Sequence, residues 1–483
     1  MSAIRNLEPK LVWEIFDDIT RVPRPSKKEG QIIEWLIGFA KQHGLEWQRD
    51  DIGNVVIRKG ATAGFENRQT IILQSHMDMV CEKNSNVDFD FDNDPIRTKV
   101  DGEWIKAEGT TLGADCGIGM AAALALLIDP TVEHGPIEAL FTVDEETGLT
   151  GAFELGENML TGRYLINLDS EDEGEIFIGC AGGVDTVATF SCEREAAPAG
   201  YKFYRMDVAN LLGGHSGDDI DKGRANSNKI AARWLYEMQG LYGLRLSLMD
   251  GGNLRNAIPR EAYAIVGVPA DVTTEFEKSF AAFAEDVKFE FHATEPNTSL
   301  TLAQTDTPAE VLTADAQRRL VGALIGLPNG VLAMSMAVAG LVETSTNLAS
   351  VKFKEGGKVV VTTSQRSSLE SGKKWAMQSV ESVFLLAGAD VEHSDGYPGW
   401  APNPDSCLLQ TTVDSYKKLF GVEPKVRAIH AGLECGLFLE KYPHLEMVSF
   451  GPTIRGVHSP DERLNIASVD KFWILLKDVI KAI

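Results

Sequence analysis

The chain has 483 residues, and 46 Lys and Arg stand against 70 Asp and Glu, so its formal net charge is −24. The length predicts two or three domains of roughly 100–200 residues each, and the 44% apolar and 24% charged composition excludes global disorder. The acidic balance, with no Lys/Arg-rich block, argues against nucleic acid as a partner, because a phosphate backbone requires a basic surface.

Neither a secretory signal nor a membrane span is predicted. The first ten residues contain no apolar core, and the richest apolar run, 117–128, is about a dozen residues where a bilayer span needs ~20. Six cysteines are scattered along the chain without a CxxC pair, which predicts reduced thiols rather than a disulfide framework or a zinc ribbon. We therefore expect a cytoplasmic protein that has no membrane partner.

Strand-like and helix-like segments alternate over the first 180 residues. Short β-branched runs bounded by turn residues predict strands at 54–58, 70–73, 137–143 and 164–168. Between them, residues 118–128 are rich in Ala and Leu on all sides, which predicts a buried helix. This alternation is typical of an α/β domain with a mixed sheet and helices on both faces.

The middle of the chain has a different pattern of predicted secondary structure. Strands are predicted at 202–208 and 359–363 and an amphipathic helix at 227–239, which indicates an α+β arrangement. The Pro- and Gly-rich stretch 397–404 then predicts that the chain crosses from one domain to another. A strand predicted at 446–450 after it belongs to the same α/β pattern as the first 180 residues. We expect a discontinuous catalytic domain, 1–183 and 398–483, interrupted by an inserted lid domain, 184–397.

Carboxylates and histidines gather at the ends of the predicted strands. Four clusters are expected directly after strands, and a histidine follows the last strand; these residues lie at 75–78, 113–115, 144–146, Asp169 and His458. A lone strand-end Asp is most often a turn or cap residue, but the carboxyl ends of parallel strands meet at one edge of a sheet. Five such clusters therefore predict a single site.

The residue types at these strand ends favour two divalent metal ions. Two imidazoles and three carboxylates suit zinc, and Co or Mn could substitute. Two ions carry +4, which three carboxylates and one hydroxide balance, and a shared carboxylate could clamp both ions. In the pair Glu145-Glu146 one carboxylate could bind metal while the other acts as general base, and His76-x-Asp78 fits a carboxylate that orients a metal-bound imidazole.

Motifs along the whole chain resemble those of the aminoacyl-histidine dipeptidases, the carnosinase-like Xaa-His dipeptidases among the co-catalytic zinc metallopeptidases. The motifs occur in the order of that family, and HAGLECGLF and RNAIPR are more particular to it than to the wider superfamily. They are SHMDM (75–79), GTTLGADCGIG (109–119), DEETG (144–148), NLDSEDEGE (167–175), GGHSG (213–217), RNAIPR (255–260), HAGLECGLF (430–438) and GPTIRGVHSPDE (451–462).

The resemblance implies a phosphorylase/hydrolase-like zinc-peptidase fold and a set of metal ligands. Asp115 is expected to bridge two ions. His76 and Asp169 would complete one metal site, and Glu146 and His458 would complete the other.

The resemblance also implies catalytic roles beside the metals. Glu145 would act as general base on a bridging metal-bound water, and Asp78 would orient His76. Cys116 departs from the family pattern, which has Asn after the bridging Asp and a strained, often cis, peptide there. A thiol at this position could make the site oxidisable if it were exposed.

Substrate contacts are expected from the middle domain. His215, in a glycine-rich turn, would stabilise the oxyanion, and Arg366 would bind the substrate carboxylate in the bidentate manner that suits a guanidinium. Asn256 would hold the substrate's carbonyl or carboxylate, and Gly432 would allow close approach to the substrate.

These expectations together predict a zinc-dependent metallodipeptidase that hydrolyses Xaa-His and related unblocked, carnosine-like dipeptides. Homodimers are common in the family, so a second copy of the chain is an expected partner besides the short peptide substrate. Two alternatives stay open at this point: a metallo-deacylase or carboxypeptidase of the same superfamily, which shares the metal core, and a binding protein that keeps the metal ligands without activity. The spare carboxylate of Glu145 argues against the second alternative.

Overall fold

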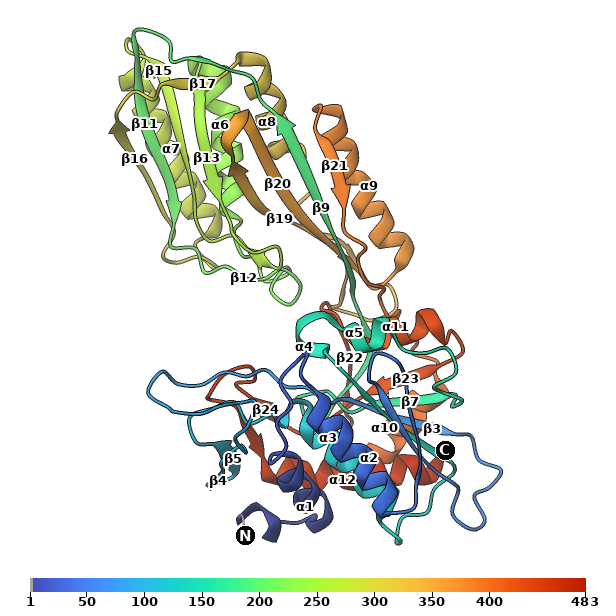
Figure 1. The fold of residues 1–483 in the computed structure, drawn as a ribbon. Helices are drawn as coiled ribbons and strands as arrows, with labels where there is room; N and C mark the ends of the chain where they lie inside the picture. The colour runs from blue at the N-terminus through green and yellow to red at the C-terminus, as the bar shows by residue number, and fades with distance from the viewer. Residues whose placement is uncertain (1–2) are drawn as a thin grey trace. The chain divides into compact units, whose positions relative to one another are not determined.

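The computed structural model describes residues 3–483, which form two compact units (Figure 1). Unit 1 comprises the chain up to Gly179 together with Pro402–Ala428 and Leu433–Ile483. Unit 2 comprises Cys180–Ala401 and the short segment Ile429–Gly432. Each unit has its own sheet and its own helices.

Unit 1 is built on an eight-stranded mixed sheet in the order β1-β2-β6-β3-β7-β23-β8-β22. The four strands β6, β3, β7 and β23 run parallel, while β2 and β8 pair antiparallel at either side of them. Every residue of β3, β6 and β7 is buried, so both faces of the sheet are covered there. The strands are β1 (Glu46–Arg49), β2 (Val55–Lys59), β3 (Ile71–His76), β6 (Ile137–Thr142), β7 (Tyr164–Asn167), β8 (Glu175–Cys180), β22 (Lys425–Ile429) and β23 (Glu446–Ser449).

Helices cover this sheet, and α3 is the most buried of them. Because α3 is apolar on nearly all sides, it packs between β3, β6 and α1 rather than presenting one face to water. The helices are η1 (Ala3–Asn6), α1 (Lys10–Ile19), α2 (Gly30–Gln42), α3 (Ala114–Ile128), α4 (Glu145–Gly148), α5 (Thr150–Phe153), α10 (Cys407–Phe420), α11 (Glu434–Lys441) and α12 (Ile466–Ala482).

A small antiparallel sheet in unit 1 joins segments that are far apart in sequence. Its order is β24-β25-β5-β4, and residues after position 450 therefore pair with residues near position 105. Its strands have only two to four residues: β4 (Thr98–Asp101), β5 (Trp104–Ala107), β24 (Ile454–Arg455) and β25 (Arg463–Asn465).

Unit 2 contains a nine-stranded antiparallel sheet in the order β16-β11-β15-β13-β19-β20-β9-β21, with β18 paired to β19. Helices α6–α9 pack against it, and their apolar side chains share one core with the sheet (Figure 1). The strands of this sheet are β9 (Gly182–Ser191), β11 (Tyr201–Ala209), β13 (Arg245–Gly251), β15 (Ala262–Pro269), β16 (Ser299–Thr305), β18 (Gly330–Met334), β19 (Val342–Phe353), β20 (Lys358–Ser367) and β21 (Asp390–His393).

Two smaller pairs of strands and five helical segments complete unit 2. The pairs are β10 (Arg194–Ala196) with β17 (Glu310–Leu312), and β12 (Gly214–His215) with β14 (Ala257–Ile258). The helical segments are α6 (Ser227–Tyr242), α7 (Thr273–Phe291), α8 (Ala314–Gly326), η2 (Glu355–Gly357) and α9 (Glu370–Leu386). Local chemistry fixes the ends of α6: the Asn226 side chain accepts hydrogen bonds from Asn228 and Lys229 N–H, and Gly243 ends the helix with a left-handed φ of 61°.

The strands and helices expected from the sequence are confirmed, with ends that differ by a few residues. The strand expected at 70–73 extends to His76, and the helix expected from 118 begins at Ala114. In residues 3–483, no helix combines the length and the hydropathy that a membrane crossing requires.

Candidate active site and metal centre

Three neighbouring parallel strands deliver acidic and histidine side chains to one edge of the unit 1 sheet. His76 is the last residue of β3 and Asp78 follows it, Glu145 and Glu146 follow β6, and Asp169 follows β7. Because β3 pairs in parallel with both β6 and β7, the carboxyl ends of all three strands meet.

Asp115 and His458 reach the same place by a different route. The expectation that the 113–115 cluster directly follows a strand is wrong, because β5 ends at Ala107 and Asp115 lies in the first turn of α3. His458 follows β24, whereas the strand expected before it, β23, ends at Ser449. Both residues are adjacent in sequence to the small four-stranded sheet, whose long-range pairing brings them together.

Asp115 lies between two histidines and presents one oxygen to each. Its Oδ1 is 3.1 Å from His76 Nε2, and its Oδ2 is 3.2 Å from His458 Nε2. His76 Nε2 also lies 3.3 Å from Asp169 Oδ1, and His458 Nε2 lies 3.0 Å from Glu146 Oε2. The five residues therefore form two histidine–carboxylate groups that share Asp115.

The donor set fits divalent metal ions. Ligand atoms of Asp115, Glu146 and His458 all lie within 4.8 Å of one another. The buried oxygen Glu146 Oε1 makes no hydrogen bond, and a buried carboxylate oxygen without a partner is costly unless a cation or a proton satisfies it. Imidazole nitrogens with carboxylate oxygens suit zinc and similar divalent ions.

The electrostatics of the site are those of a cation-binding centre. Hydrogen bonds to Asp115 and Glu146 raise the pKa of His458 to about 11. Burial alone would raise the pKa of Asp115, but hydrogen bonds from His458 and His76 hold it well below its usual range. Burial raises the pKa of Asp169 to about 6. The histidines thus lie in a strongly negative potential that would equally attract a divalent ion.

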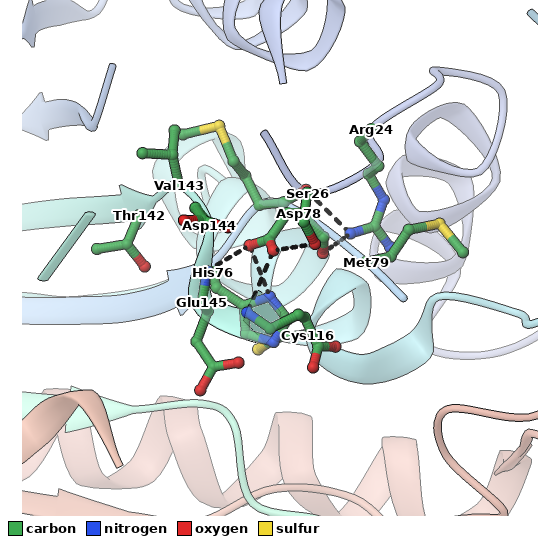
Figure 2. Close-up of polar contacts among 12 residues, drawn as sticks. Arg24, Ser26, His76, Asp78, Met79, Cys116, Thr142, Val143, Asp144 and Glu145 are labelled. Atoms are coloured by element: carbon green, nitrogen blue, oxygen red, sulfur yellow. Dashed lines mark hydrogen bonds and ion pairs between the residues drawn. The ribbon is translucent and has the colours of Figure 1, made fainter. Parts of the chain in front are cut away.

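Asp78 organises the side chains behind this centre (Figure 2). Its Oδ1 lies 3.4 Å from His76 Nδ1 and accepts the Glu145 N–H at 3.1 Å, while its Oδ2 accepts the Ser26 hydroxyl at 2.8 Å and the Glu146 N–H at 3.3 Å. One carboxylate therefore contacts the imidazole of His76 and also holds the backbone that carries Glu145 and Glu146.

Glu145 lies beside the metal-ligand set and is half-buried. Burial raises the pKa of Glu145 well above its usual range, and the negative charges of Asp169 and Glu434 add to this shift although His76 opposes it. A carboxylate with a raised pKa is a stronger proton acceptor at neutral pH than an ordinary glutamate. Its position next to Glu146 is compatible with the division of labour expected for this pair.

Unit 2 brings its four predicted residues into one neighbourhood of its own. Arg366 Nη2 lies 3.5 Å from His215 Nε2, and Arg366 Nη1 donates to Tyr397 Oη at 2.9 Å. A side chain on Gly432 would meet the Tyr397 ring at 2.9 Å, so Gly432 borders the same cluster. Asn256 precedes Ala257, which pairs with His215 in the β12–β14 ladder.

The sequence did not reveal what surrounds Arg366. Arg366 is only 7% exposed, and the side-chain partners described for its guanidinium within residues 3–483 are Tyr397 and His215 rather than an Asp or Glu. His430, 6% exposed, bonds through Nε2 to Ser345 Oγ at 2.7 Å, and burial together with the charge of Arg366 lowers the pKa of His430 to about 3. An uncompensated buried guanidinium beside a neutral imidazole and a tyrosine hydroxyl is suited to an anionic ligand.

A buried acid in unit 1 was also missed. Glu434 Oε2 accepts hydrogen bonds from Gln74 Nε2 at 2.6 Å and Thr142 Oγ1 at 2.9 Å, and burial raises its pKa to about 8. Gln74 and Thr142 lie on β3 and β6, two residues before His76 and three before Glu145. Glu434 is part of the HAGLECGLF motif, but its partners come from distant strands, so sequence alone gave no signal for this contact.

Comparisons with known proteins identify peptidases that are similar to this chain. Residues 72–482 match the model of peptidase family M20/M25/M40. The chain is 44% identical to the cytosol non-specific dipeptidase of Escherichia coli (strain K12), over 100% of this chain and 99% of that protein. It superposes with a TM-score of 0.96 on the crystal structure of the aminoacylhistidine dipeptidase from Vibrio alginolyticus, at 45% identity over 100% and 98% of the two chains. An aminopeptidase from Bacillus cereus, at 17% identity over 98% of each chain and a TM-score of 0.57, has the same fold.

Proposed function

Because the chain belongs to peptidase family M20/M25/M40, we propose that it is a metal-dependent dipeptidase acting on Xaa-His and related dipeptides with free termini. The observation that carries the proposal is the placement of Asp115, whose two oxygens face two different histidines. Full-length similarity to two proteins named as dipeptidases supports the choice of a dipeptide rather than a longer peptide.

The residues of unit 1 fit two divalent ions, with zinc the first choice. His76 and Asp169 would hold one ion, Glu146 and His458 would hold the other, and Asp115 would bridge them. When bound, such ions supply Lewis acidity that polarises a carbonyl and acidifies water.

The chain's own residues would then move the protons. Glu145, half-buried and with a raised pKa, takes the proton of the attacking water and returns it to the departing amine. Asp78 keeps Glu145 in place through the backbone N–H and keeps His76 in orientation through Nδ1.

Residues of unit 2 would bind the ends of the dipeptide. Arg366 lacks an acidic partner of its own, so a substrate carboxylate would supply the missing counter-charge in a bidentate pair. His215 would donate to the oxyanion, Asn256 would hold the substrate's carbonyl or carboxylate, and Gly432 would leave room for the peptide next to Tyr397.

A substrate panel on metal-reconstituted enzyme tests this function. Xaa-His and carnosine-like dipeptides should be hydrolysed at least ten times faster, in kcat/KM, than their C-terminal amides, because the amides lack the carboxylate that would pair with Arg366. They should also be hydrolysed faster than N-acetyl amino acids, which keep the carboxylate but lack the free amino terminus of a dipeptide. A preference for N-acetyl amino acids would instead establish the deacylase alternative.

Replacing the proposed base should separate binding of metal from turnover. Glu145→Ala should keep its metal content and lose about 100- to 10,000-fold in kcat, because a positioned general base contributes that much. Exposed Glu157 provides a matched control, and Glu157→Ala should behave as wild type in both measurements. Near-normal turnover by Glu145→Ala would refute the assignment.

We also propose that the enzyme works in the cytosol. The six cysteines are scattered along the chain without a CxxC pair, which suits a reducing compartment, and the Escherichia coli relative is named as a cytosol enzyme.

A further inference from the structure

Two buried, oppositely charged side chains flank the turn that leads into Asp115. Arg24 lies between α1 and α2, and Glu462 lies just before β25, and each is only 2% exposed. Neither belongs to the metal-ligand set or to the substrate residues described above. Burying a charge is costly, so two such charges at one turn call for an explanation beyond general packing.

Glu462 accepts hydrogen bonds from the backbone along the whole turn. Its Oε2 accepts from the N–H groups of Leu112 at 2.7 Å and Gly113 at 3.0 Å, and its Oε1 accepts from Ala114 at 2.8 Å and Asp115 at 3.4 Å. Glu462 also lies only four residues after His458. The carboxylate therefore ties the loop that carries His458 to the turn that carries Asp115.

Arg24 holds the same turn from the other side. Its Nη2 donates to the Gly113 carbonyl, and its Nη1 donates to the carbonyls of Met77 at 3.0 Å and Asp78 at 2.6 Å. Figure 2 shows the guanidinium beside Asp78 and Met79 at the end of β3. Arg24 thus ties the turn that carries Asp115 to the segment that carries His76 and Asp78.

The two side chains meet on a single peptide unit. In the peptide between Gly113 and Ala114, the Gly113 carbonyl accepts a hydrogen bond from Arg24, and the Ala114 N–H donates one to Glu462. Gly113 has a left-handed φ of 69°, and a Cβ there would lie 2.5 Å from Arg24 Nη2, so the close approach of the guanidinium requires glycine.

We propose that Arg24 and Glu462 are paired positioning residues that clamp the 113–114 peptide and thereby hold Asp115 between His76 and His458. The proposal rests on the proposed function in one respect, that Asp115 is a shared metal ligand. Arg24 and Glu462 join the three segments that carry the proposed ligands His76, Asp115 and His458, and both bond to this peptide, which makes the clamp a determinant of metal geometry.

The test uses the full-length protein with Glu462→Gln, Arg24→Lys and the double variant. Gln keeps the shape of Glu462 but turns an N–H₂ group toward backbone N–H donors, and Lys keeps the charge of Arg24 but cannot bridge three carbonyls in a planar fork. Matched controls are Glu138→Gln and Arg58→Lys, because Glu138 is also 2% exposed, accepts the N–H groups of Thr161 and Gly162, and pairs with Arg58.

Metal affinity is measured with Co²⁺ on chelated protein by calorimetry and by the visible spectrum of the bound ion. Each single variant should lose about 10- to 100-fold in affinity with an altered spectrum, as for other groups that orient metal ligands. The double variant should lose no more than the weaker-binding single, because both side chains act on one peptide. Hydrogen exchange of metal-free Glu462→Gln should be faster at the amides of 112–115, and the controls should match wild type in every readout.

Several results would overturn the clamp. Unchanged Co²⁺ affinity and spectrum in both single variants would show a purely structural role, and additive losses in the double variant would show two independent effects. If Glu462→Gln does not fold, two other variants test the clamp: Arg24→Lys, and Gly113→Ala, whose added methyl group pushes against Arg24. Both must then show the loss of Co²⁺ affinity for the clamp to stand. If the wild-type protein hydrolyses no dipeptide but the variants still lose Co²⁺ affinity as expected, only the proposed function is refuted, and the clamp stands.

Discussion

Cys116 places a thiol beside the proposed metal ligands without exposing it to solvent. It is 1% exposed, its Sγ donates to the Leu168 carbonyl at 3.4 Å, and its Sγ lies within 4.8 Å of ligand atoms of His76 and Asp169. The Asp115–Cys116 peptide is cis, as the family resemblance implied. Burial and the charge of Asp169 raise the pKa of the Cys116 thiol well above its usual range, so the reactive thiolate is scarce.

We therefore expect Cys116 to resist alkylation. Iodoacetamide at pH 8 should label exposed Cys407 in the native, chelated protein and leave Cys116 unmodified, with a rate difference of at least roughly tenfold. Both thiols should react after unfolding, which serves as the control. Peptide mass spectrometry gives the measurement, and rapid native labelling of Cys116 would contradict the burial described above.

His430 should make unit 2 sensitive to mild acid. Its pKa is lowered to about 3, first by burial and then by Arg366, whereas an unfolded histidine titrates near 6.5. Between these values the unfolded chain binds the proton and the folded chain does not, so the stability associated with this residue is complete above about pH 6.5 and is lost as the pH falls toward 3.

A variant without the His430 imidazole should therefore have a Tm that depends less on pH than the Tm of the wild-type protein. Between pH 7 and pH 5, the Tm of His430→Gln should fall less than that of wild type, as followed by scanning calorimetry. The exposed His292, also in unit 2, gives the matched control, and His292→Gln should keep the wild-type slope. Equal slopes for His430→Gln and wild type would show that His430 is protonated in the folded protein.

At the level of single residues, sequence predicted the acids and histidines and the contact of Asp78 with His76, but not the buried residues that hold the backbone around them. His76, Glu145, Glu146 and Asp169 stand at strand ends, where topology alone brings them together. Arg24 and Glu462 bond to backbone groups of residues about 90 and 350 positions away, and no local pattern encodes such a contact.

Helix α3 is closely packed, as a comparison of Gly119 in α3 with Gly322 in α8 shows. A Cβ on Gly119 of α3 would lie 2.6 Å from Cys116 Sγ and 2.8 Å from the Leu168 carbonyl oxygen, which is backbone and cannot move away cheaply. A Cβ on Gly322 of α8 would meet nothing within 4 Å.

Opposite effects of the same substitution are therefore expected. Gly119→Ala should destabilise the protein by about 1–3 kcal/mol through overpacking. Gly322→Ala should stabilise it by about 0.5–1 kcal/mol, because alanine restricts the unfolded chain and suits a helix interior. Thermal and denaturant unfolding of the metal-free protein measures both, and a neutral Gly119→Ala would mean that α3 can shift away from β7.

Elements were predictable where periodicity is strong and were missed where strands are short. The buried parallel strands and the apolar α3 have local patterns that the sequence displays directly. The two- to four-residue strands β4, β5, β24 and β25 have no such pattern, since only pairing between distant segments defines them. This is why the route by which Asp115 and His458 reach the site was misjudged.

On the scale of the whole molecule, all proposed metal ligands belong to unit 1, while unit 2 has a separate core. Metal binding should therefore stabilise only one of the two units, by an amount that grows with the ratio of free metal to its Kd. We expect calorimetry to resolve two unfolding transitions. Chelation of the metal should lower the Tm of one transition by several degrees and leave the Tm of the other unchanged.

A control identifies the transitions. Gly322→Ala, in unit 2, should shift only the transition that chelation leaves unchanged. A single transition that moves as a whole on chelation would mean that the two units unfold together.

The division into a discontinuous catalytic domain and an inserted lid is predicted from a change of secondary-structure pattern along the chain, from alternating strands and helices to an α+β segment and back. Sequence could not predict that Ile429–Gly432 packs with unit 2, because that assignment depends on hydrogen bonds from Ala181 and on the Tyr397 ring beside Gly432.

The position of β23 has a consequence for synthesis on the ribosome. This strand sits in the interior of the unit 1 sheet between β7 and β8, yet it is translated only after the whole of Cys180–Ala401. While unit 2 is emerging and folding, β7 and β8 have an open gap between them, and His458 does not yet exist. A nascent chain therefore carries four of the five proposed ligands as an incomplete centre, and the enzyme becomes competent only when its last strands close the sheet.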